Sequence, residues 1–65
     1  MKIYKISAVY NGNTLYFNRQ CATFLTKCAT AYNSKADAKK DLEYARKCAP
    51  DDEILKTIKI VEIVF

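Results

Sequence analysis

The sequence predicts a small α+β domain with a ββαβ fold, in which a three-stranded antiparallel sheet of order 2-1-3 carries one helix on one face. Three observations predict it. An Asn-Gly pair separates two alternating runs, a Ser-capped helix carries one apolar stripe, and a β-branched run follows that helix. With 65 residues, one Gly and one Pro, the chain is expected to form a single domain, 1–65.

The first two strands are predicted from the dipeptide Asn11-Gly12. Both residue types adopt positive φ readily, as a two-residue type I′ hairpin turn requires. One face of the hairpin is then mostly apolar and the other mostly polar, and a one-residue shift would destroy this separation. The expected apolar pairs are Ile6 with Phe17 and Ala8 with Leu15, and the expected pairs on the other face are Lys5 with Asn18, Ser7 with Tyr16 and Val9 with Thr14.

A helix is predicted from Ser34 to about Cys48. Ser34 and Asp37 have the spacing of a capping box, with Asp in place of the usual Glu. Pro50 is expected to end the helix, and the acidic run 51–53 to form a polar connection. A narrow stripe of mostly small residues at helical spacing is expected to pack on the sheet: Ala38, Leu42, Ala45 and Ala49.

The third strand is predicted from Lys56 to Phe65, because this run is rich in β-branched residues. Both alternating sets of its side chains are largely apolar, so we expect either a bulge or, more simply, that both sides of the strand become buried. The helical crossover places it beside the first strand, with the helix on one face and the opposite face uncovered.

In the segment Cys21 to Asn33, Phe24, Leu25, Cys28 and Ala31 fit a short helix, while the run 28–32 fits equally well a short extended piece that leads into the helix cap. The segment is therefore expected to be irregular cover for one end of the sheet.

The composition argues against catalysis. The chain has no His, which removes the commonest general base and metal ligand. Its three Cys are odd in number and form no CxxC pair, so reduced, structural thiols are expected. We therefore expect no enzyme activity, no metal and no cofactor. No apolar run approaches a membrane span and no export signal is visible, so a cytoplasmic location without membrane association is expected.

The positive charge lies in the first half of the chain. Residues 1–36 carry five basic side chains and no acid, whereas residues 37–65 carry six bases and seven acids, which together give the net charge of +4. Tyr and Asn residues accompany the bases, a combination that suits an acidic protein, a nucleic acid or an anionic nucleotide. No nucleic-acid-binding motif appears. The candidate binding residues are Lys2, Lys5, Tyr16, Arg19 and Lys27.

The uncovered sheet face is the second candidate for binding. An exposed apolar patch normally marks a dimer or partner interface. In the alternative interpretation, the segment 21–33 folds over this face and covers it. The candidate residues of a homodimer or partner face are Ile3, Val9, Val61, Ile63 and Phe65.

The segment from Ala29 to Ala38 has the form A-x-x-aromatic-x-S-x-x-D-A. Together with the Asn-Gly hairpin before it and the apolar strand after it, this order resembles small phage-encoded ββαβ accessory proteins, a group that includes some anti-CRISPR proteins and other host-defence inhibitors. The resemblance implies a non-enzymatic inhibitor that occludes a host protein complex in the bacterial cytoplasm. The alternatives are a basic nucleic-acid-binding protein and a protein that sequesters an anionic nucleotide signal.

Overall fold

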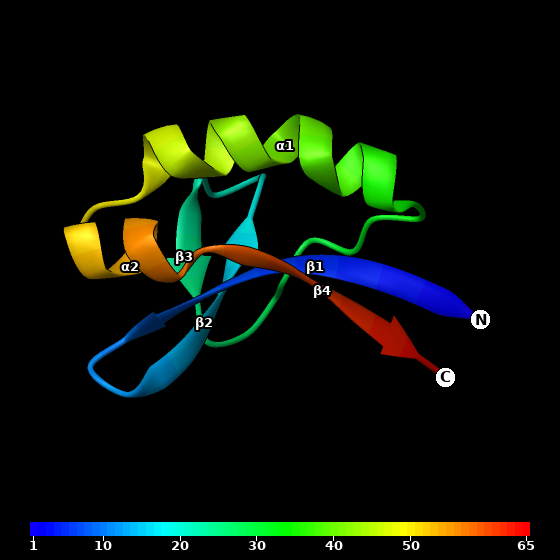
Figure 1. Cartoon of the computed structure of the whole chain (residues 1–65), viewed down its shortest axis with the longest axis horizontal. Coiled ribbons are helices and arrows are strands. Elements are labelled where there is room, and N and C mark those ends of the chain that lie inside the picture. The colour runs from blue at the N-terminus through cyan, green and yellow to red at the C-terminus, as the bar shows by residue number, and fades with distance from the viewer.

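A computed structural model describes all 65 residues as an α+β domain with a four-stranded antiparallel sheet and two helices (Figure 1). The strands lie in the order β3-β2-β1-β4, so the predicted 2-1-3 arrangement forms the middle and one edge of a larger sheet. The elements are β1 (Lys2–Tyr10), β2 (Asn13–Asn18), β3 (Thr23–Leu25), α1 (Lys35–Cys48), α2 (Asp52–Thr57) and β4 (Lys59–Val64).

The hairpin forms in the predicted register. Asn11 and Gly12 have φ values of 52° and 78°, as a type I′ turn requires. Three of the expected pairs are ladder partners: Ser7 with Tyr16, Ala8 with Leu15 and Val9 with Thr14. The ladder ends at Ser7 and Tyr16, so the predicted pairs Ile6–Phe17 and Lys5–Asn18 do not form.

The segment Cys21 to Asn33 is not irregular throughout, so this prediction was wrong for β3, whereas residues near Tyr32 adopt the extended alternative. Thr23–Leu25 forms β3, which pairs with β2 and makes Phe24 a buried core residue. Farther on, Tyr32 exchanges two backbone hydrogen bonds with Tyr4 of β1, at 2.9 and 2.8 Å, and the Thr30 amide donates to the Phe17 carbonyl of β2. The segment therefore lies between the separating ends of β1 and β2, which is why their ladder stops early.

The predicted helix cap is confirmed. The Ser34 hydroxyl accepts a hydrogen bond of 3.2 Å from the amide of Asp37, and α1 ends at Cys48. The predicted stripe faces the sheet, because Ala38 and Ala45 are fully buried. Small side chains on this stripe let the helix approach β1 and β4 closely.

The acidic run after Pro50 is not a connection but the beginning of a second helix. Asp51 is its cap and accepts a 2.7 Å hydrogen bond from the Glu53 amide, while acidic side chains in the first turn suit the positive end of the helix dipole. Ile54 then points into the core. Because Lys56 and Thr57 belong to α2, the last strand is shorter than the predicted range Lys56 to Phe65.

The hydrophobic core lies on one side of the sheet, beneath α1 and beside α2 (Figure 1). Its largest fully buried side chains are Phe17 and Ile6. Ile58 and Ile60 pack against this core, whereas Val61 and Ile63 remain partly exposed on the other side. The expectation that both sides of the last strand become buried is therefore wrong. None of the helices is long and apolar enough to span a membrane.

The turn gives a direct test of the register. Gly12→Ala is expected to lower the free energy of unfolding by about 1 kcal/mol, because an L side chain disfavours positive φ. Nothing lies within 4 Å of the added methyl group, so backbone strain alone is tested. Urea unfolding measures the change, and Asn13→Ala is the matched control. Equal stability of Gly12→Ala and wild type would contradict the assigned turn.

Candidate functional site

Figure 1 shows no helix on one side of the sheet, which we call the open face. Its members alternate with the buried side chains Ile6 and Ala8 on β1, Phe17 on β2 and Phe24 on β3, and the strand register extends the face to β4. No acidic residue is among them. The open face consists of Ile3, Lys5, Ser7, Val9, Thr14, Tyr16, Asn18, Thr23, Leu25, Lys59, Val61 and Ile63.

Two lysines and a tyrosine occupy the middle of the open face. The Lys5 ammonium lies 5.6 Å from the centre of the Tyr16 ring, in a cation–π contact. Ser7 pairs with Tyr16 on one side and with Lys59 on the other, and it is only 2% exposed because the larger neighbours enclose it. The centre of the face is thus cationic and aromatic.

An apolar region adjoins these lysines toward the edge strand β4. Ile3 and Ile63 are direct cross-strand partners, and Val61 is the partner of Lys5. Phe65 follows β4 and is 66% exposed. The structure therefore brings together four of the five predicted interface residues, whereas Val9 lies at the hairpin end, opposite Thr14.

The predicted basic set divides into different surfaces. Lys5 and Tyr16 meet, but Lys2 points to the opposite side of β1 and lies 3.1 Å from Glu62. The hydrogen bond and charge of Glu62 raise the pKa of Lys2. Lys27 lies in the exposed turn after β3.

Lys59 is the open-face residue that sequence reasoning omitted. It shares the alternation of Val61 and Ile63, which were predicted to lie on the uncovered face, but it was not included with them. Pairing of Lys59 with Ser7 places it on the open face.

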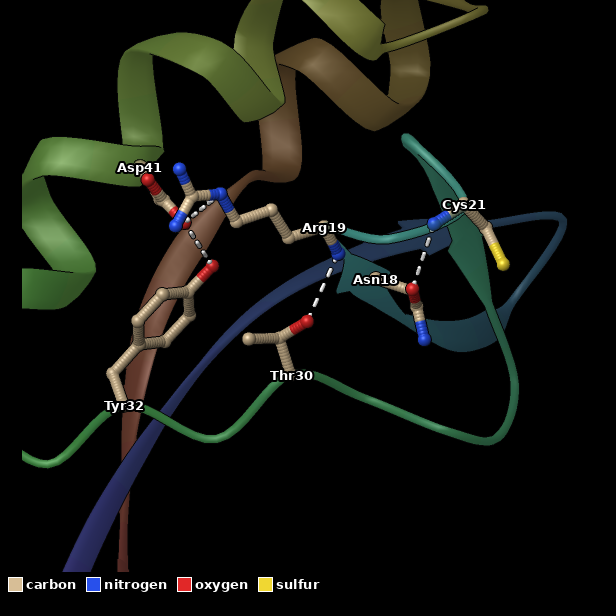
Figure 2. Close-up of polar contacts among 6 residues, drawn as sticks. All are labelled: Asn18, Arg19, Cys21, Thr30, Tyr32 and Asp41. Atoms are coloured by element: carbon tan, nitrogen blue, oxygen red, sulfur yellow. Dashed lines mark hydrogen bonds and ion pairs between the residues drawn. The ribbon is translucent and has the colours of Figure 1, made fainter.

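Arg19 belongs to a polar cluster between α1 and the segment 28–33 (Figure 2). The Tyr32 hydroxyl donates a 2.9 Å hydrogen bond to Asp41 Oδ2, and Arg19 Nε lies 3.6 Å from the same oxygen. Burial, and then the bond to Asp41, raise the pKa of Tyr32. The charge of Arg19 is therefore balanced by Asp41, and the cluster ties the segment to the helix.

Two shallow depressions of about 750 and 530 Å³ adjoin Arg19 and share Thr30. The second also contains Asp37, Lys40 and Asp41, so its charges compensate one another. Both depressions are open and lined mostly by polar residues, so they lack the enclosed apolar lining of a small-molecule site.

Asn18 fixes the rest of this segment (Figure 2). Its Oδ1 accepts a 2.9 Å hydrogen bond from the Cys21 amide, and its Nδ2 donates to the Cys28 carbonyl. The Arg19 amide donates to Thr30 Oγ1 at 2.9 Å. These bonds hold the segment at the end of the sheet where β2 stops. The expectation that the segment covers one end of the sheet is confirmed at this end.

The three cysteines are free thiols, and no group of three or more His, Cys, Asp or Glu is placed to hold a metal ion. What the open face offers is contact area, two positive charges and an aromatic ring.

The Tyr32–Asp41 bond yields a pH-dependent test. Tyr32→Phe is expected to lower the free energy of unfolding at pH 7 by about 1–2 kcal/mol, since it removes a hydrogen bond to a carboxylate. The raised pKa favours neutral Tyr32 in the folded state, so its contribution is present below about pH 10 and lost as pH rises further.

The difference between wild type and Tyr32→Phe should therefore shrink above about pH 10, by up to about 1.4 kcal/mol per pH unit. Urea unfolding at several pH values measures it, with Tyr10→Phe as the control, because Tyr10 is on the exposed end of the hairpin. A difference that stays constant or grows through this range would contradict the assigned role of Tyr32.

A scan against protein-family models and searches of curated proteins and of solved structures find no match to this chain. The function is therefore inferred from the geometry and charge of the open face.

Proposed function

We propose that this chain is a non-enzymatic protein-binding module whose open face docks on an acidic surface of a larger protein. The observation that carries the proposal is the charge of this face. It holds Lys5 and Lys59, contains no acidic side chain and has no helix over it.

Charge complementarity selects the partner. Acidic side chains of this chain lie on the helices, at the helix cap Asp51, or on the helix side of β4, so none of them neutralises the open face. An acidic partner gains attraction to Lys5 and Lys59 and is steered toward the face as it approaches. A second copy placed face to face would instead bring like charges together.

The apolar region supplies the second component of the contact. Ile3, Val61 and Ile63 are partly exposed side by side next to the lysines. Stable interfaces combine an apolar centre with a polar rim, and aromatic residues such as Tyr16 are enriched in them. The partner surface is therefore an apolar patch bordered by carboxylates.

The resemblance to small phage-encoded accessory proteins supports a more specific proposal. The chain is a phage-type inhibitor or modulator that occludes a host defence complex in the bacterial cytoplasm. An inhibitor that acts by occlusion needs a binding surface but no catalytic group. The open face supplies such a surface.

Single-stranded nucleic acid is the second candidate, because the Lys5–Tyr16 pair could stack a base and contact a phosphate. Only two lysines lie on the face, and Arg19 is paired with Asp41 away from it. The protein partner is therefore preferred, and the nucleic acid becomes an outcome of the test.

Two charge-matched double variants test the proposal. Lys5→Gln/Lys59→Gln neutralises the open face, and Lys35→Gln/Lys39→Gln removes the same charge from α1, where both lysines are exposed. Each is immobilised and incubated with nuclease-treated bacterial lysate, and the retained proteins are quantified by mass spectrometry. We expect a protein that wild type and the α1 variant both retain. The amount of it retained by the open-face variant should be about tenfold lower, which corresponds to a loss of about 1.4 kcal/mol in binding free energy.

Equal retention of the same proteins by both variants would contradict the open face as the binding surface. Direct titration with a single-stranded oligonucleotide separates the second candidate. If the oligonucleotide binds wild type with an affinity that falls steeply with salt, and the open-face variant loses this binding, the face is a nucleic-acid site and the protein-binding proposal fails.

A further inference from the structure

The outer edge of β4 is a second unpartnered surface, distinct from the open face. β4 pairs only with β1 and ends the sheet on that side. Among the backbone hydrogen bonds outside helices and strands, the only one near β4 joins Phe65 to Met1, which is again on the β1 side. The outward backbone groups of β4 therefore have no partner in the chain.

The bond pattern identifies those groups. Met1 and Phe65 exchange hydrogen bonds of 2.7 and 2.9 Å, so in an antiparallel ladder the next pairs that do so are Ile3–Ile63 and Lys5–Val61. Tyr4 agrees with this alternation, because its backbone bonds Tyr32 on the other side of β1. The residues whose amide and carbonyl groups point outward are Ile60, Glu62 and Val64.

An unprotected edge is a template for another strand. The side chains at its end are also exposed: Val64 by 67% and Phe65 by 66%. Natural sheets commonly blunt an edge with a proline or a bulge, and β4 pairs continuously with β1 from Lys59 to Val64 and contains no proline. The only protective features left on β4 are its two charged side chains, Lys59 and Glu62.

We propose that the β4 edge pairs antiparallel with β4 of a second copy, in the register that places Ile63 opposite Ile63 of that copy. Val61 then lies opposite Phe65, and Glu62 opposite Val64. The outward groups of Glu62 and Val64 exchange backbone hydrogen bonds with those of Val64 and Glu62 in the second copy. The two open faces become neighbouring parts of one continuous sheet surface.

Charge and polarity favour this register over the symmetric ones centred on Glu62 and on Val61. Centring the pair on Glu62 would place two carboxylates directly opposite each other, which is destabilising. Centring it on Val61 would oppose Lys59 to Ile63 and Glu62 to Ile60. In the Ile63 register, every open-face contact is between apolar side chains, and each Glu62 keeps its own Lys2 partner at 3.1 Å.

Disulfide trapping tests both the dimer and its register. The native thiols are first removed as Cys21→Ser, Cys28→Ser and Cys48→Ala, and Ile63→Cys or Val61→Cys is added. Oxidised glutathione then converts two facing thiols to one disulfide, while it is itself reduced to two glutathione molecules. In the proposed register, residue 63 lies directly opposite residue 63 of the second copy, at a non-hydrogen-bonded position of the ladder. The Cα atoms of such a pair are about 4.5 Å apart, so a disulfide can form.

Ile63→Cys is expected to give a covalent dimer of twice the 7.4 kDa monomer mass on a non-reducing gel, at several times the rate of Val61→Cys. Faster trapping of Val61→Cys would overturn the register. Because the test needs no other ligand, its result is separate from that of the open-face proposal.

Light scattering of the unmodified chain supplies an independent measurement. The mass is expected to rise from 7.4 kDa toward twice that value with increasing concentration. Val64→Pro removes an outward amide and is expected to shift this rise to higher concentration than Val64→Ala does, since the latter keeps the amide. A constant monomer mass for the unmodified chain would overturn the dimer.

Discussion

The central constraint in this fold is the alternation of side chains along β1. This strand pairs with β2 and β4, bonds Tyr32 through Tyr4, and contacts both helices. The turn at Asn11-Gly12 fixes its register with β2, so one set of its side chains enters the core and the other remains on the open face. A shift of one residue would bury Lys5 and expose Ile6.

A chain of this size completes one core and has little apolar surface left for another. The buried apolar side chains of the core all lie on the helix side, where Ala38 and Ala45 let α1 approach the sheet. Tyr32 joins this core through its ring while its backbone extends the pairing of β1. Stability thus comes from one side of the sheet, which leaves the other side available for a partner.

Local signals predicted the elements that local chemistry determines. Asn11-Gly12, the Ser34 cap and the β-branched final run each specify their own conformation, and each is present. Of the two missed elements, β3 depends on distant contacts and α2 does not. Thr23–Leu25 is too short to show periodicity and becomes a strand by pairing with β2, whereas the cap at Asp51 is a local signal that was interpreted as a charged loop. In the candidate site, the side of Val61 and Ile63 was predicted correctly, and pairing of Lys59 with Ser7 adds this lysine to the same face.

Exposure of individual methyl groups most directly tests the division between core and open face. Methyl NMR with a soluble paramagnetic agent, in a neutral and an anionic form, reports which side chains solvent reaches. We predict strong broadening at Ile3, Val61 and Ile63, greater with the anionic agent because Lys5 and Lys59 are nearby, and protection of Ile6 and Ile54 from both agents. Equal protection of the two sets, or equal broadening, would contradict a one-sided sheet with an available cationic face.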